Sequence, residues 1–128
     1  MTNDDEHGPE FDRVAIQAFK EISERWQLDA RSRSRLLEVP ESVIQAWFEH
    51  PELAHLERAQ LERISYLIGI YGALHAFYGD PNQQSADDWP RRSNLYFGGR
   101  TALDRMLDGI EGVIEVHEYA LNAAYGGW

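Results

Sequence analysis

The chain has 128 residues, of which 43% are hydrophobic and 12% aromatic, and its formal net charge is −10. This length and hydrophobicity suffice for the core of one domain or two small packed subdomains, so the chain is not disordered as a whole. The absence of cysteine excludes disulfides, thiol catalysis and thiolate metal sites. The acidic balance suits a basic protein partner better than nucleic acid, and the alternative is that the charge only serves solubility.

The first segment, residues 1–9, is predicted to be a disordered acidic tail that ends at Gly8-Pro9. It lacks the basic and then apolar order of a signal peptide. No apolar run in the chain is long enough to cross a bilayer. We therefore expect a cytoplasmic protein without membrane contact.

The first helix is predicted over about residues 10–27. Its apolar residues recur at spacings of three and four and form one stripe. These residues are Phe11, Val14, Ala15, Ala18, Phe19, Ile22 and Trp26. Glu21 and Arg25 are spaced for an ion pair on another face of the helix.

Two short helices are predicted to follow. Asp29 is a suitable N-cap for a helix that ends near Glu38, and Pro40 suits the first turn of the next helix, which ends at His50-Pro51. Three helices over residues 10–52 have the spacing of a helix-turn-helix unit. We expect this unit to form the N-terminal part of an all-α fold.

In a helix-turn-helix unit the third helix would enter the major groove of DNA. Here Ser42 and Gln45 could read bases, but Glu41 and Glu49 are acidic and the helix has no Lys or Arg. Three arginines upstream could contact phosphates. They are Arg31, Arg33 and Arg35. The alternative is a three-helix packing unit that binds no DNA, and the acidic third helix favours it.

A longer helix is predicted over about residues 57–78, with Leu61, Ile64, Leu67 and further apolar residues in its main stripe. A second stripe consists of small residues. They are Gly69, Gly72, Ala73 and Ala76. Because glycine in a helix costs about 1 kcal/mol relative to alanine, this stripe indicates either another helix crossing closely or the seam of a homodimer.

Residues 79–93 are predicted to form a loop in which Trp89 anchors a short turn, and Asp87-Asp88 to be solvated charge. Thr101 and Asp104 have the spacing of a capping box for a short helix to Asp108. A final helix is predicted over about residues 111–124. The C-terminal half is therefore helical too, and the fold class is all-α, with the three-helix unit packed on a C-terminal helical domain over residues 53–128.

Residues 94–101 allow two interpretations. The backbone N–H groups around the two glycines could hold a phosphate or carboxylate. Alternatively, the glycines supply positive φ angles for a tight turn, and Arg100 pairs with Asp104 one helical turn later. The segment lacks the Gly-Lys-Ser/Thr ending of a phosphate-binding loop, which favours the tight turn.

No catalytic constellation is visible, so we expect no enzyme activity, no metal site and no cofactor. No serine lies in a nucleophile elbow, and the histidines show no metal-binding spacing. The histidines are His7, His50, His55, His75 and His117. His75 and His117 lie on or beside apolar stripes and are expected to pack there with hydrogen bonds. An enzyme acting at the glycine-rich segment is the least favoured hypothesis.

Three blocks of sequence, in this order, resemble the Xre/MbcA/ParS antitoxin family. They are residues 61–71 (LERISYLIGIY), Asn94 with residues 97–106 (FGGRTALDRM), and residues 125–128 (YGGW). The resemblance implies a helix-turn-helix part followed by a toxin-binding domain. It also implies a RES-domain toxin as partner, which degrades NAD and is neutralised by direct binding over its active-site cleft.

Carried onto this chain, the family motifs give the candidate toxin-binding residues Gly98, Gly99, Arg100, Asp104, Arg105, Tyr125, Gly126, Gly127 and Trp128. Trp128 could fold back on its own core or dock in the partner, since tryptophan is a frequent interface anchor. We interpret the chain as the antitoxin of a type II toxin–antitoxin system whose C-terminal end plugs the toxin, with promoter autoregulation as a further activity. The alternative is a stand-alone helix-turn-helix transcriptional regulator.

Overall fold

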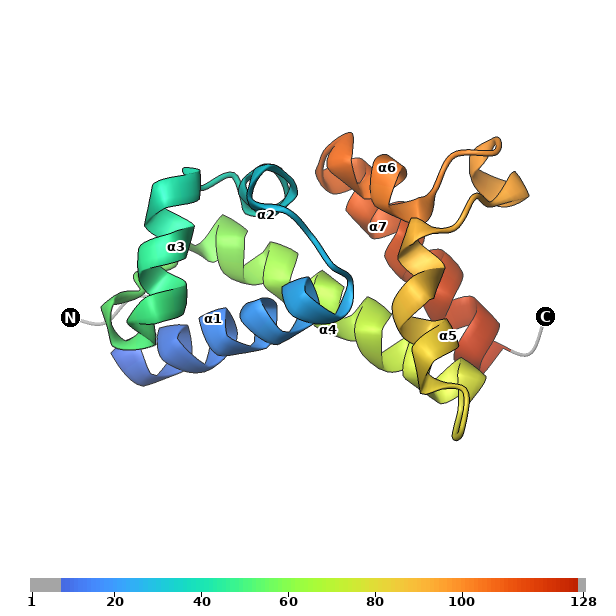
Figure 1. Cartoon of the computed structure of the whole chain (residues 1–128), viewed down its shortest axis with the longest axis horizontal. Helices are drawn as coiled ribbons and strands as arrows, with labels where there is room; N and C mark the ends of the chain where they lie inside the picture. The colour runs from blue at the N-terminus through green and yellow to red at the C-terminus, as the bar shows by residue number, and fades with distance from the viewer. Residues whose placement is uncertain (1–7, 127–128) are drawn as a thin grey trace.

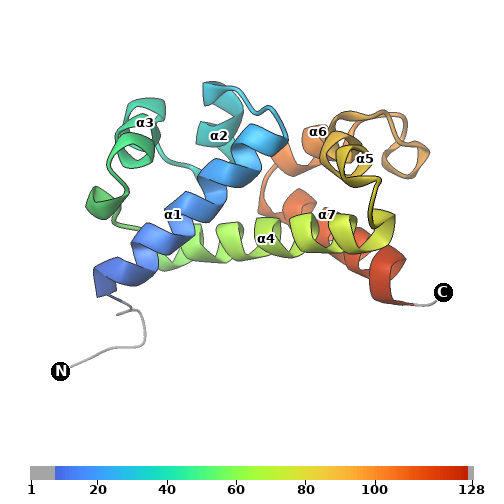
Figure 2. The same cartoon turned by 60° about the horizontal axis from the view of Figure 1, so that its bottom comes forward.

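One long helix, α4 (Arg58–Tyr78), supports both halves of the molecule (Figure 1). The computed structural model describes residues 8–126, and residues 1–7 and 127–128 lie outside the description. Within the described part the chain is all-α, as predicted, and one isolated bridge between Ser93 and Thr101 is its only β-type pairing. In Figure 2, α1 to α3 lie above one end of α4, and α5 to α7 lie at the other end.

The N-terminal half contains α1 (Gly8–Arg25), α2 (Ala30–Leu37), α3 (Glu41–Glu49) and the short turn η1 (Pro51–Leu53). Helix α1 begins two residues before the predicted position. Its buried face includes Phe19 and Ile22, as predicted, and Trp26 directly after the helix is buried too. The prediction was wrong for Phe11 and Val14, which are more than half exposed. The buried face already includes Asp12, so Phe11 and Val14 lie to one side of it.

The predicted caps of the next two helices are found in the structure. The Asp29 carboxylate accepts a hydrogen bond from the Ser32 N–H at 2.8 Å and begins α2. Glu38 ends α2 with a φ of 59°, a left-handed conformation that is uncommon outside glycine. Pro40 directly precedes α3, one residue earlier than predicted, and His50 follows its last residue.

Two arginines tie α2 to the second half of the chain. Arg63 of α4 donates to the Leu36 carbonyl at 3.4 Å and lies 3.3 Å from the Glu38 carboxylate. Arg35 donates to the Leu107 carbonyl, at the end of α6, at 2.8 Å. In both cases a guanidinium meets the carbonyl end of a helix, where the helix dipole is negative.

The C-terminal half contains two helices, α6 (Ala102–Leu107) and α7 (Ile110–Leu121), and a π-helical turn, η4 (Asn122–Gly126). The predicted loop over residues 79–93 is largely helical instead. It forms α5 (Gln83–Asp88) and the short turn η2 (Trp89–Arg91), in which Trp89 takes part as predicted. Packing of Ala86 into the core explains why this polar sequence is ordered.

Asp87 is buried, which corrects the expectation that it is solvated. Its carboxylate lies 2.8 Å from the His75 Nε2 and 3.6 Å from an Arg25 nitrogen. The other ring nitrogen of His75 lies against the Gln83 side chain, so the predicted hydrogen-bonded packing role of His75 is confirmed. Arg25 also pairs with Glu21 at 3.7 Å, as its spacing predicted. This cluster joins α1, α4 and α5 through polar contacts.

Close helix crossings explain two glycines. A Cβ at Gly69 would lie 2.7 Å from the His117 ring, so α7 crosses α4 here, as the small-residue stripe predicted. A Cβ at Gly112 would lie 1.9 Å from the Arg105 carbonyl oxygen, which places α7 directly against α6. Gly72 has no such neighbour and is exposed, so the homodimer seam stays a prediction.

Replacing Gly112 with alanine tests the second crossing. The added methyl group meets backbone rather than a flexible side chain, so we expect Gly112→Ala to lower the free energy of unfolding by at least about 2 kcal/mol. The matched control, Gly72→Ala, adds the same group in open space and is expected to raise it by up to about 1 kcal/mol. Urea unfolding followed by circular dichroism measures both. Equal stability of the two variants would contradict the close crossing.

Candidate functional site

Aromatic side chains gather where three segments meet: the end of α4, the short turn η2 that follows α5, and α7. The rings of Trp89 and Tyr119 are stacked, with centroids 5.9 Å apart and planes 15° apart. Phe97 lies 6.3 Å from Trp89 and 5.7 Å from Tyr119. Phe97 is buried, whereas the other two rings are half-buried. These contacts fix the segment 93–101 against α7.

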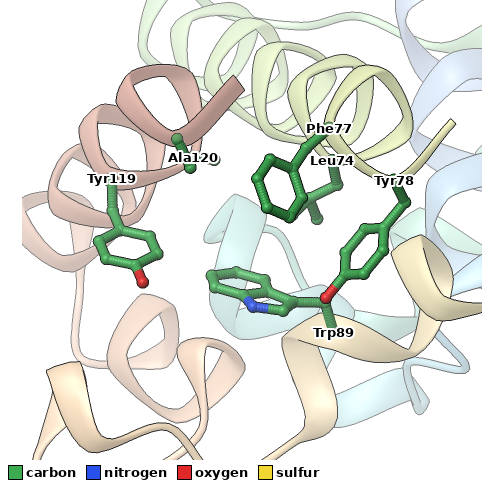
Figure 3. Close-up of a pocket in the computed structure, with 7 residues that line it drawn as sticks. Leu74, Phe77, Tyr78, Trp89, Tyr119 and Ala120 are labelled. Carbon is green, nitrogen blue, oxygen red and sulfur yellow. The ribbon is translucent and has the colours of Figure 1, made fainter. Parts of the chain in front are cut away.

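A small apolar pocket opens beside this cluster, with an empty volume of about 340 Å³. Figure 3 shows Phe77, Trp89 and Tyr119 around it. Its full lining is Leu74, Phe77, Tyr78, Trp89, Tyr119, Ala120 and Ala123. Ala123 belongs to η4, so the pocket lies at the C-terminal end of the described chain. Sequence reasoning missed it because its lining residues come from three separate segments.

The two glycines form a tight turn after η3 (Leu95–Phe97), with φ angles of 71° at Gly98 and 86° at Gly99. Their N–H groups donate to the carbonyls of Leu95 and Asn94, both at 3.0 Å. The N–H of Arg100 donates to Phe97 at 3.3 Å. Because all three amides are used inside the turn, they are not available as an anion nest, and the tight-turn interpretation is correct.

Arg100 closes the turn onto α6, but through a different partner from the one predicted. Its guanidinium donates to both oxygens of Asp108, at 2.9 and 3.1 Å, and to the backbone carbonyl of Asp104. The Asp104 carboxylate instead accepts from the Thr101 N–H at 3.3 Å. The Thr101 hydroxyl accepts from the Asp104 N–H at 2.9 Å, which completes the predicted capping box.

These ion pairs shift two protonation equilibria. The hydrogen bonds from Arg100 hold the pKa of Asp108 below its ordinary value, and the Asp108 carboxylate raises the pKa of Arg100. Arg105 adds a third link, because its Nε donates to Glu115 on α7 at 2.6 Å. Most of the predicted toxin-binding charges therefore stabilise the α6–α7 corner itself.

The remaining predicted toxin-binding residues lie at the chain's end. Tyr125 and Gly126 are exposed in η4, while Gly127 and Trp128 lie outside the described residues. Two apolar residues that sequence reasoning missed are exposed at the glycine turn. Leu95 is 93% exposed and Tyr96 is 54% exposed. The apolar run Leu95-Tyr96-Phe97 directly before the two glycines could have indicated them from the sequence.

The candidate DNA-binding residues are only partly at the surface. Arg33 donates to the Leu28 carbonyl at 3.1 Å and lies over the Phe48 ring, and Arg35 is bonded to α6 as described above. Arg31, Arg35, Ser42 and Gln45 are exposed, and Arg33 is half-buried. Gln45 donates to the acidic Glu49 at 2.9 Å. The structure therefore uses two of the three arginines for packing and leaves α3 acidic.

Residues 7–69 match the family model described as the antitoxin Xre-like helix-turn-helix domain. The N-terminal half is therefore an Xre-like antitoxin helix-turn-helix domain. A relative named "Uncharacterized protein y4oB", from Sinorhizobium fredii (strain NBRC 101917 / NGR234), is 35% identical over 114 residues, which cover 88% of this chain and 84% of that protein. The similarity to y4oB thus extends well beyond the matched Xre-like domain, into the half that holds the aromatic pocket.

Two negative findings apply to residues 8–126. No helix there is long and apolar enough to span a membrane. In the same residues, no group of three or more His, Asp or Glu side chains could hold a metal ion.

The Arg100–Asp108 pair can be tested by titration. In Arg100→Gln the Asp108 carboxyl loses its charged donor, so its pKa should rise toward the ordinary value. Since the folded-state pKa of Asp108 is depressed in the native chain, the stabilisation is present above the ordinary carboxyl range and is lost as pH falls through the folded pKa. Carbon-detected NMR of the Asp108 carboxyl measures the shift, with Arg100→Lys as the charge-preserving control. An unchanged Asp108 titration in Arg100→Gln would contradict the assignment.

Proposed function

We propose that this Xre-like protein is the antitoxin of a type II toxin–antitoxin system. In this proposal it neutralises a RES-type, NAD-degrading toxin by binding directly over the toxin's active-site cleft. The resemblance to the Xre/MbcA/ParS family supports the choice of toxin. Residues 53–128 would then be the toxin-binding part, and residues 10–52 the helix-turn-helix part. The antitoxin would act by binding alone, without a cofactor.

The observation that carries this proposal is the acidic charge of α7, which leads to the exposed chain end. Residues 106–126 contain no Lys or Arg. Asp108 and Glu115 pair with Arg100 and Arg105 in the corner, whereas Glu111 and Glu118 are exposed. Tyr125 and Gly126, which follow α7, are exposed as well. A cleft that holds the phosphates of a dinucleotide needs positive charge, and an acidic chain end would be attracted to it.

The C-terminal residues are proposed to enter the toxin, whereas Gly98, Gly99, Arg100, Asp104 and Arg105 position the last two helices. Glycines at 126 and 127 allow the backbone to pass a narrow opening. Trp128 offers an aromatic ring, and the terminal carboxylate a negative charge. We assign the corner residues this positioning role because their contacts, described above, are with partners within the chain.

Deleting residues 126–128 should abolish neutralisation while the fold is kept, because none of the described core residues is removed. The measurement is growth of cells that express the toxin together with either form, at equal antitoxin abundance. A thermal melt of the purified deletion variant provides the folding control. A deletion variant that still protects the cells would contradict the proposal.

The Xre-like domain favours promoter DNA as a second partner. We propose that Arg31, Ser42 and Gln45 make the DNA contacts, and that the acidic α3 keeps binding by the chain alone weak. An electrophoretic mobility shift assay with promoter DNA at 150 mM salt should show no complex below about 1 µM chain, since non-specific binding falls in the range of about 1–100 µM. Added toxin should lower the required concentration. A sequence-specific shift by the chain alone at nanomolar concentration would favour the stand-alone regulator.

A further inference from the structure

Among the described residues, most of the exposed large apolar side chains fall into two groups, and Ile68 in the middle of α4 is a further one. One group lies on the outer side of α1 and η1, and consists of Phe11, Val14 and Leu53. The other lies in the C-terminal half and consists of Phe77, Leu95, Tyr96 and Tyr125. Single exposed apolar residues are ordinary, whereas a contiguous group marks a binding surface. In the second group, Tyr96 and Phe77 adjoin the aromatic pocket, and Leu95 precedes Tyr96 in the same short turn.

Contacts between rings join the glycine turn to the pocket. Tyr96 lies 4.4 Å from Tyr119, centroid to centroid, and Tyr119 is stacked on Trp89. Tyr119 and Trp89 line the pocket together with Phe77, which is more than half exposed (Figure 3). The result is one apolar surface with a projecting side chain, Leu95, at one side and a recess at the other. We call it the Leu95–Phe77 surface.

The projecting side is rigid. The Asn94 side chain accepts from the Tyr96 N–H at 2.9 Å, and the Ser93 hydroxyl donates to the Gly99 carbonyl at 2.6 Å. The Asn94 N–H donates to the Arg100 carbonyl at 3.0 Å. A leucine held at 93% exposure by such a turn loses little entropy on binding, because the backbone is already fixed.

We propose that the Leu95–Phe77 surface is a docking site for the partner toxin, in addition to the C-terminal residues. This inference rests on the proposed function. Leu95 inserts into an apolar recess of the toxin, and an apolar toxin side chain fills the pocket beside Phe77. The surface ends at Ala123 of η4, three residues before Gly126, so it is continuous with the chain end proposed to enter the toxin.

Charge favours a basic partner over a second copy of this chain. Glu118 and Asp80 are exposed and lie within two residues of the pocket residues Tyr119 and Tyr78 in the chain. The nearby cations have partners within the chain, because Arg91 pairs with Asp88 and Arg92 donates to the Ser85 carbonyl. Pairing two such surfaces would bring these carboxylates close to each other, whereas a basic partner would pair with them. The net charge of −10 acts in the same direction over longer distances.

The test compares two exposed leucines in short helical turns. Full-length Leu95→Asp and the control Leu53→Asp are titrated against the protein encoded by the adjacent reading frame, inactivated by mutation, in a calorimeter. Leu53 is 62% exposed and belongs to the other apolar group. Leu95→Asp should raise the dissociation constant at least about 30-fold, the scale of an interface hot spot. Leu53→Asp should raise it less than about 3-fold. Leu95→Ala, which adds no charge, should weaken binding in the same direction.

The outcomes separate this inference from the proposed function. If the wild-type chain does not bind the adjacent gene product, the proposed function fails and the inference with it. If wild type and Leu95→Asp bind equally well while deletion of residues 126–128 abolishes binding, only the Leu95–Phe77 assignment is overturned. It is also overturned if sedimentation shows a wild-type dimer that Leu95→Asp converts to a monomer, because the surface then serves self-association.

Discussion

The structure depends on the burial of α4 on more than one side. Its apolar residues face α1 and α2 along its first part and α5 and α7 along its last part. Ile64, Leu67 and Ile70 are almost fully buried, and each such side chain contributes on the order of 2 kcal/mol. If α4 separated from one half of the molecule, apolar residues of that half and of α4 would be exposed to solvent. The two halves therefore share one core, although only the first corresponds to the matched Xre-like domain.

Polar groups are used mainly to hold the helix ends and corners. Arg35 and Arg63 bind the carbonyl ends of helices, and Arg100 and Arg105 join α6 to its neighbours. The charged motif residues of the α6–α7 corner therefore mostly bond to partners within the chain. The features proposed for a partner are the apolar surface around Leu95, the exposed Glu111 and Glu118 of α7, and the C-terminal residues.

The glycine turn has a structural role and at the same time supports the proposed binding surface. Gly98 and Gly99 adopt positive φ angles, which L-amino acids with side chains disfavour. The turn uses its own amides, so it has none left for an anion. The hydrogen bonds of the turn hold Leu95 and Tyr96 at the surface, near the aromatic pocket. In this chain, the turn links the α6–α7 corner to the proposed docking surface.

Local physical rules made part of this structure predictable. The caps at Asp29 and Thr101, the end of α3 at His50 and the long helix over residues 57–78 follow from spacing and side-chain chemistry within a few residues. The crossing at Gly69 was also visible, because glycine in a helix requires a packing reason. The ordered α5 was not visible, since its polar sequence is stabilised by the distant His75 and Arg25.

The sequence by itself determined the all-α class, the order of the main helices without α5, the acidic character and the antitoxin resemblance, because these depend on periodicity, composition and short motifs. Only the tertiary structure decided that Arg100 pairs with Asp108, that Arg33 and Arg35 serve packing, and that Leu95, Tyr96 and Phe77 share one surface with the aromatic pocket. These outcomes depend on contacts between segments far apart in the chain. Spacing along one helix or turn does not specify such contacts.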